Sequence, residues 1–79
     1  MKWLFYIDVF NYCPAGNDGQ LKVPAAVARS NRKLRELAAS WKGNRRGAVY
    51  AMSDWTQAMC ELSPARFGEY IAAHGTRVA

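Results

Sequence analysis

The sequence predicts an α+β domain, in which a small two- or three-stranded sheet packs on one central amphipathic helix and a C-terminal pair of short helices completes the core. Two observations favour this fold class. Residues 2–12 are rich in aromatic and β-branched residues and contain neither Gly nor Pro, which is typical of a strand. Residues 24–42 instead repeat their apolar side chains with the period of a helix that has one buried face.

Length and composition favour a single folded domain that covers residues 1–79. Of the 79 residues, 51% are hydrophobic and 22% are charged, which argues against a disordered chain. Eleven Lys and Arg against six Asp and Glu give a net charge of +5. This charge favours anionic partners and argues against a protein that mimics nucleic acid.

The N-terminal apolar run resembles the start of an export signal but ends too early. Asp8 interrupts it, and no small-residue cleavage site follows. No apolar stretch approaches the roughly 18 residues needed to cross a bilayer. We therefore expect a soluble, cytoplasmic protein that lies outside the membrane.

The cysteine and histidine content predicts neither a metal nor a cofactor. Cys13 and Cys60 are the only cysteines and His74 is the only histidine, which is too few for a disulfide scaffold or a four-ligand zinc site. Two free thiols and a single Cys13–Cys60 bridge both remain open.

Alternation along the first predicted strand separates two faces. The face that we expect to contact the core carries Trp3, Phe5, Ile7 and Val9. The other face is amphipathic, as expected for a face that is partly covered by the C-terminal segments or used for contact, and carries Leu4, Tyr6, Asp8, Phe10 and Tyr12. Residues 13–20 have the composition of a turn, so residues 21–23 are expected to return beside the first strand as a hairpin.

The central helix is predicted to run from Pro24 to Lys42, because proline suits a first helical position and Gly43 follows as a stop. Its apolar stripe consists of Val23, Val27, Leu34, Leu37, Ala38 and Trp41. Burial of each of the three large side chains, Leu34, Leu37 and Trp41, should stabilise the fold by about 1.5–3 kcal/mol. The stripe therefore decides which way the helix faces.

The remainder of the chain predicts one further strand and two short helices. Residues 47–52 form the strand, and the order strand, helix, strand suggests a crossover unit whose strands run parallel or antiparallel. Residues 53–62 have the pattern of a short helix. Ser63 and Pro64 open a second helix that ends at Gly75, and residues 76–79 are expected to fray.

The strongest chemical feature is a cationic set from the predicted helix and the turn after it. It consists of Arg29, Arg32, Lys33, Arg35, Lys42, Arg45 and Arg46. Neighbouring cations can hold phosphates or an acidic protein face, and arginine suits both because its guanidinium fork matches their geometry. The alternative is a solvated helix face with an Arg32–Glu36 pair at i, i+4 spacing.

Three other patterns suggest function. Aromatic residues on the first strand offer a stacking platform for single-stranded nucleic acid, or simply the core of a small domain. Residues 53–75 have the outline of a helix-turn-helix, but the second helix offers few cations. His74 fits a helix C-terminal position better than a catalytic role, because local spacing places no nucleophile beside it.

Asp8 follows the first strand, where a metal-dependent nuclease carries its first carboxylate. The segments YID, RSNRKLREL and VYAM resemble the CRISPR adaptation protein family Cas-two, whose opening strand ends in Asp and is followed by an Arg-rich helix and a short strand. This resemblance implies a ferredoxin-like half and a nuclease that uses Asp8. The likeness ends at Met52, after which helices replace the expected strands.

Small size, a compact single domain and the lack of a catalytic set resemble small phage-encoded inhibitors of host defence, such as anti-CRISPR proteins. This resemblance implies a non-enzymatic protein that occludes an acidic protein or ribonucleoprotein surface of a CRISPR-Cas complex. We expect the cationic set to make that contact. A direct nucleic-acid-binding module is the alternative, and a metal-dependent nuclease is the third possibility.

Overall fold

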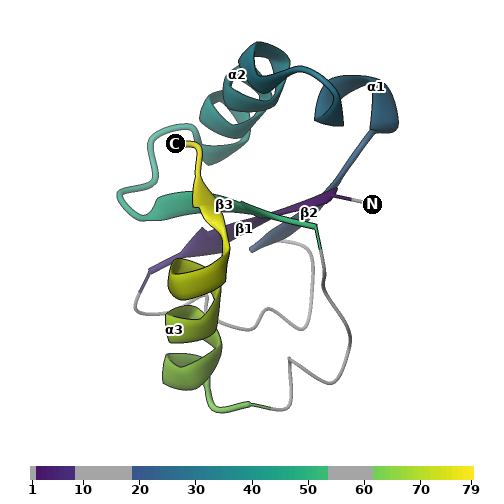
Figure 1. Ribbon diagram of the computed structural model, residues 1–79. Helices are drawn as coiled ribbons and strands as arrows, with labels where there is room; N and C mark the ends of the chain where they lie inside the picture. Colours follow the sequence, from purple (N-terminus) through teal and green to yellow (C-terminus); the bar gives the residue numbers. More distant parts are fainter. Residues whose placement is uncertain (1, 9–18, 54–61) are drawn as a thin grey trace.

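The computed structural model of the chain describes residues 2–8, 19–53 and 62–79 and shows a sheet with helices on both faces (Figure 1). Within these ranges the sheet has four antiparallel-paired strands in the order β2-β1-β3-β4. The strands are β1 (Lys2–Ile7), β2 (Gln20–Val23), β3 (Ala48–Met52) and β4 (Thr76–Arg77). The helices are α1 (Ala25–Ala28), α2 (Asn31–Lys42) and α3 (Pro64–His74). The predicted α+β class is confirmed, with more strands than the two or three expected.

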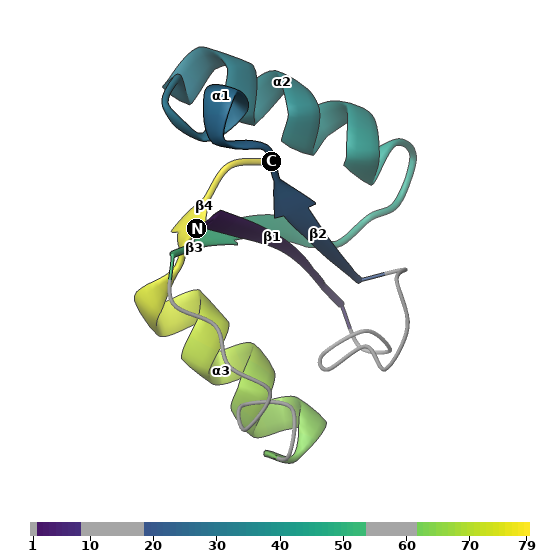
Figure 2. The ribbon, with the colours of Figure 1, turned by 90° about the vertical axis from the view of Figure 1, so that its right-hand side faces the viewer.

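Strand β1 lies inside the sheet and is buried on both faces. Leu4 and Tyr6 pack in one cluster with Leu34 and Ala38 of α2. Phe5 belongs to a second cluster on the opposite face, where its ring meets the Phe67 ring of α3 edge-on at 5.7 Å between centroids. Figure 2 shows α2 above the sheet and α3 below it. The strand therefore needs both helices to remove its side chains from water.

The expected assignment of the two faces of the first strand is wrong in one respect. The face that carries Leu4 and Tyr6 contacts the central helix, and the face that carries Phe5 contacts the C-terminal helix. The reverse was expected because Asp8 made the Leu4 face look amphipathic, yet Asp8 lies just beyond the end of β1. The expectation that aromatic residues form the core is confirmed for Phe5 and Tyr6, which are too buried to stack on a nucleic acid.

The predicted central helix is two helices. Ser30 adopts an extended conformation, with φ −121° and ψ 117°, and its hydroxyl oxygen accepts a hydrogen bond from the Lys33 backbone N–H at 3.3 Å. Serine competes with the helix in this way because its side chain can satisfy an amide that the first turn leaves unpaired. The apolar stripe still holds, since Leu34 and Ala38 are buried and Val27, Leu37 and Trp41 pack against the same cluster.

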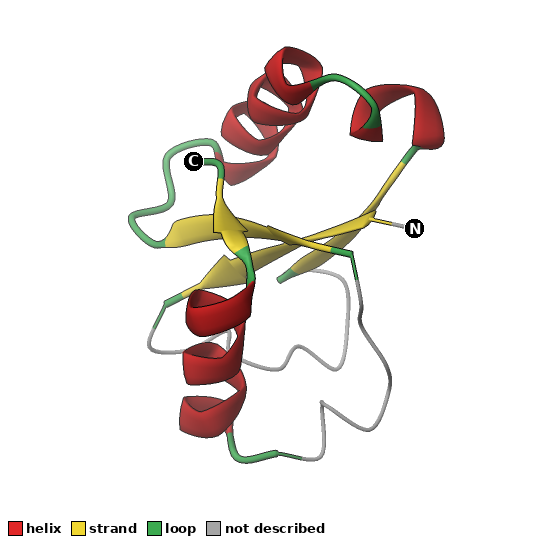
Figure 3. Ribbon diagram, in the orientation of Figure 1, coloured by secondary structure: helices red, strands yellow, loops and turns green. Residues whose placement is uncertain are grey.

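The crossover between β2 and β3 joins parallel strands with β1 between them. Both strands pair antiparallel with β1, so they run in the same direction on either side of it, and α1 and α2 cover one face of the sheet between them (Figure 3). The predicted hairpin of the first two strands is confirmed by pairing of Leu4 with Leu21. Its tip, with Cys13, lies outside the described residues.

The C-terminal tail is ordered, contrary to the expectation of fraying. Thr76 and Arg77 pair with β3, the Val78 N–H donates to the Val49 carbonyl at 2.8 Å, and the Val49 N–H donates to the Ala79 carbonyl at 3.1 Å. Val78 is only 8% exposed and joins the cluster under α2. The tail is held because it supplies backbone partners and an apolar side chain to an otherwise open edge of β3.

Helix α3 is the second of the two C-terminal helices that the sequence predicts. As expected, Ser63 caps it by accepting a hydrogen bond from the Arg66 N–H at 3.4 Å, and Gly75 follows its last residue. Phe67 and Ile71 are completely buried against the sheet. The first predicted helix, over residues 53–62, lies almost wholly outside the described residues, as does Cys60.

Replacing Val78 with Ala should lower the free energy of unfolding by about 1.5 kcal/mol, because two buried methyl groups are removed. Thr76→Ala, in the same segment but exposed, should change it by less than about 0.5 kcal/mol. Chemical denaturation with urea measures both. Equal effects of the two substitutions would show that the tail frays in solution.

Ser30→Ala should destabilise the protein by about 1 kcal/mol through loss of the cap of α2. Ser40→Ala is the matched control, because Ser40 is exposed within the same helix. Since alanine has the higher helix propensity, this control should stabilise the protein by a few tenths of a kcal/mol. Urea denaturation should thus give opposite signs for the two variants, and a stabilising Ser30→Ala would mean that α1 and α2 form one helix.

Candidate anion-binding surface

The predicted cationic set divides between the two ends of α2. Arg29 precedes the helix, Arg32 and Lys33 lie in its first turn, and all three are exposed. Lys42 ends the helix, and the turn after it carries Arg45 and Arg46. About 13 Å of helix axis separates Lys33 from Lys42, at 1.5 Å per residue. The set therefore forms two groups, with Arg35 nearer to the first.

Arg45 is held by the fold. Its Nε donates to the Lys42 carbonyl at 3.2 Å and its terminal Nη2 donates to the Trp41 carbonyl at 2.9 Å, so it satisfies acceptors that the end of α2 leaves open. The guanidinium carbon also lies 4.1 Å from the centroid of the Tyr6 ring and 4.9 Å from that of the Trp41 ring. Of the predicted contact residues, Arg45 is thus the one whose position is explained without a partner.

Glycines shape the turn that holds Arg45. Gly43 has φ +58°, a left-handed conformation that glycine adopts without strain. The Gly47 N–H donates to the Tyr6 hydroxyl at 2.8 Å, and a Cβ at Gly47 would come within 2.7 Å of the Tyr6 ring. The tyrosine hydroxyl can be buried because this backbone amide is its partner.

Cations at the N-terminal end of α2 lie where the helix dipole disfavours them. The first turn contains no acidic residue, but it contains Arg32 and Lys33 beside the positive end of the dipole. Each such placement costs about 0.3–1 kcal/mol. Arg32 also contacts Glu36 at 3.7 Å, but their side chains are 78% and 66% exposed, so the pair adds little stability. Among the described residues, no carboxylate forms an ion pair with Lys33.

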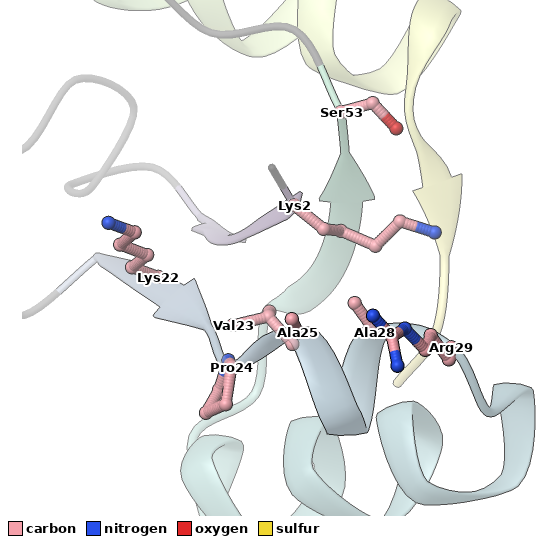
Figure 4. A pocket seen from close by; sticks show the side chains of 8 residues that line it. All are labelled: Lys2, Lys22, Val23, Pro24, Ala25, Ala28, Arg29 and Ser53. Atoms are coloured by element: carbon pink, nitrogen blue, oxygen red, sulfur yellow. The ribbon is translucent and has the colours of Figure 1, made fainter.

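Two hollows adjoin this end of α2. The first has a volume of about 660 Å³ and is lined by three basic residues, Lys2, Lys22 and Arg29 (Figure 4). The second has a volume of about 500 Å³ and contains Lys2 and Arg35. Lys2 and Ser53 line both hollows, so the hollows are neighbours. Figure 4 shows Lys2 and Lys22 pointing in opposite directions, with Lys2 directed toward the side of β4.

Lys2 and Lys22 were not among the cations predicted from the sequence. Both lie in paired strands, where Lys2 is opposite Val23 and Lys22 is opposite Trp3, so the two lysines are diagonal neighbours in the sheet. The approach of these strands to Arg29 and Arg35 depends on the chain reversal between β2 and α2. One basic residue in each strand is a weak signal by itself, so the cluster becomes visible only in the fold.

The sequence also suggested Asp8 and His74 as candidate functional residues. Asp8 follows the end of β1. In the part of the chain that the structure describes, no group of three or more His, Cys, Asp or Glu side chains is arranged to hold a metal ion.

His74 ends α3, as predicted, and its ring lies 4.4 Å from that of Tyr70 between centroids. None of the described helices is long and apolar enough to cross a membrane.

Comparison with known proteins gives no relative: no family model, curated protein or solved structure matches this chain. Function is therefore inferred from the charges, hollows and exposed faces described above.

Arg45→Lys should destabilise the protein by about 1–2 kcal/mol, although it keeps the charge. Lysine cannot form the guanidinium stack with Tyr6 and the two carbonyl contacts together. Arg46→Lys is the matched control, because Arg46 is exposed in the same turn, and it should change stability by less than about 0.5 kcal/mol. Urea denaturation at low salt checks both. If Arg45→Lys is neutral, the contacts of Arg45 contribute nothing to the fold.

Proposed function

We propose that this protein is a non-enzymatic binding protein whose exposed cations around the N-terminal end of α2 engage an acidic surface of a protein or ribonucleoprotein. The observation that supports this function is the position of Arg29, Arg32 and Lys33. They stand together where the helix dipole opposes them. An anionic partner would relieve this unfavourable interaction. Contacts with these cations therefore add more binding free energy than contacts with cations placed elsewhere on the surface.

The surface around these cations favours a protein partner over a nucleic-acid backbone. Glu36 is 66% exposed beside Arg32 and would repel phosphates along this face. Ala25 and Ala26 of α1 are exposed next to Arg29 and add small apolar contacts. Arginine is also enriched at protein interfaces relative to the rest of the surface. The contact residues are therefore Arg29, Arg32, Lys33 and Arg35, with Lys42 and Arg46 contributing at the far end of α2.

The resemblance to phage-encoded inhibitors points to a first target. A small basic protein in the bacterial cytoplasm can occlude the docking site of a large host complex without any chemistry of its own. CRISPR-Cas ribonucleoproteins are such complexes. Inhibition then arises from steric block, and its salt dependence reflects the number of ion pairs at the contact.

Lys33→Glu should weaken partner binding at least about tenfold, because a like-charge contact costs several kcal/mol. The same substitution should raise protein stability by about 0.5–1 kcal/mol, since a glutamate three residues after Ser30 completes a capping box at the positive end of α2. Loss of binding together with increased stability excludes unfolding as the cause. Urea denaturation and capture of partners from nuclease-treated bacterial lysate, followed by mass spectrometry, measure the two effects.

Arg66→Glu is the matched control, because Arg66 holds the same position after the Ser63 cap of α3. It has the same charge change and the same expected gain in stability, and it should leave partner capture unchanged. Equal capture by Lys33→Glu would place the contact elsewhere. Binding of duplex or single-stranded DNA more tightly than about 10⁻⁶ M at physiological salt would replace this function with a nucleic-acid-binding one.

A further inference from the structure

We name the second hollow the α2–α3 pocket. It has features of a ligand-binding site, and Arg29, Arg32 and Lys33 do not line it. Its volume of about 500 Å³ lies within the usual range for small-molecule sites. Its walls come from the first residue of β1, the first half of α2, the end of β3, the end of α3 and β4. Convergence of five elements on one pocket gives its residues fixed relative positions.

The accessible lining of the α2–α3 pocket is mainly polar. Leu34, Ala51, Met52 and Val78 lie behind it and are at most 8% exposed. The lining side chains that can donate hydrogen bonds are Lys2, Asn31, Arg35, Ser53, Tyr70, His74 and Thr76. Among the described lining residues there is no carboxylate. The cations therefore favour a ligand with an anionic group, and the Tyr70 and His74 rings favour one that also carries a ring.

The two helices contribute different kinds of polar residue to the pocket. Arg35 comes from the first half of α2, whose N-terminal end is the positive end of the helix dipole. Tyr70 and His74 come from the C-terminal half of α3, which disfavours an anion, and their rings lie together at 4.4 Å between centroids. Lys2 lines the pocket from β1, and its side chain points toward β4 (Figure 4). The anionic group belongs at the α2 wall and the ring of the ligand at the α3 wall.

We propose that the α2–α3 pocket binds a nucleoside phosphate, with the phosphate between Lys2 and Arg35 and the base against the Tyr70–His74 ring pair. The phosphate gains charge-assisted hydrogen bonds from an ammonium and a guanidinium. The base gains stacking contacts that are available to any heterocycle. This site shares only Arg35 with the proposed partner contact, because Arg29, Arg32 and Lys33 do not line the pocket.

Titration of the uniformly ¹⁵N-labelled protein with adenosine monophosphate, followed by NMR, tests the site. Amide resonances of the α2–α3 pocket should shift, whereas those of α1 should not. Adenosine and inorganic phosphate, each alone, should bind at least about tenfold more weakly, because each fills one end only. A short 5′-phosphorylated oligonucleotide is the second probe. Tighter binding of this oligonucleotide with the same shifts would support the site and identify a strand end as the source of the nucleotide.

Arg35→Gln and His74→Ala should each weaken binding of adenosine monophosphate at least about tenfold. Arg66→Gln is the matched control for charge, because Arg66 is exposed in the first turn of α3 and does not line the pocket. It should leave the affinity unchanged, and unaltered circular dichroism spectra verify folding of all three variants. Equal affinity for inorganic phosphate and the nucleotide, or an equal loss in Arg66→Gln, would overturn the proposal and leave only attraction by net charge.

Discussion

Burial of β1 on both faces is the constraint on which the rest of the structure depends. Leu4 and Tyr6 require an apolar cover on one side of the sheet, and Phe5 requires one on the other. A short chain supplies both covers by placing α2 and α3 on opposite faces. Strands β2 and β3 pair with both edges of β1 and satisfy its backbone. The crossover that passes from β2 to β3 follows, because β1 already occupies the place between them.

Local sequence patterns predicted the parts of the fold that depend on residues close together in the sequence. The helical period placed Leu34 and Ala38 on one buried face, and the Ser63–Pro64 pair predicted the start of a helix. Periodicity says which side chains of β1 alternate, but it does not say which helix covers each face, since that depends on the path of the whole chain. Val78 is the clearest case. A two-residue strand carries no repeating pattern, so only its contacts with the cluster beneath α2 reveal that the tail is part of the core.

Side-chain interactions with the backbone explain the break at Ser30 and the position of Arg45. A helical pattern continues through Ser30, yet the hydroxyl of Ser30 caps α2 and the chain turns there. The sequence shows Arg45 as one cation among seven, whereas the fold places its guanidinium over two aromatic rings, one from β1 and one from α2. Lys2 was missed for a related reason. Its closeness to Arg35 depends on strand register and on the turn between β2 and α2.

The two ends of α2 carry cations that stand in opposite relation to the helix dipole. At the C-terminal end, Lys42 and Arg45 lie where the dipole attracts them, and Arg45 also satisfies helix carbonyls. Stability therefore accounts for the position of Arg45. At the N-terminal end, Arg32 and Lys33 oppose the dipole, and a fold selected only for stability would carry Asp or Glu in that turn. Because the same helix shows both arrangements, net charge alone does not explain the N-terminal group, and this is the ground on which we propose an anionic partner.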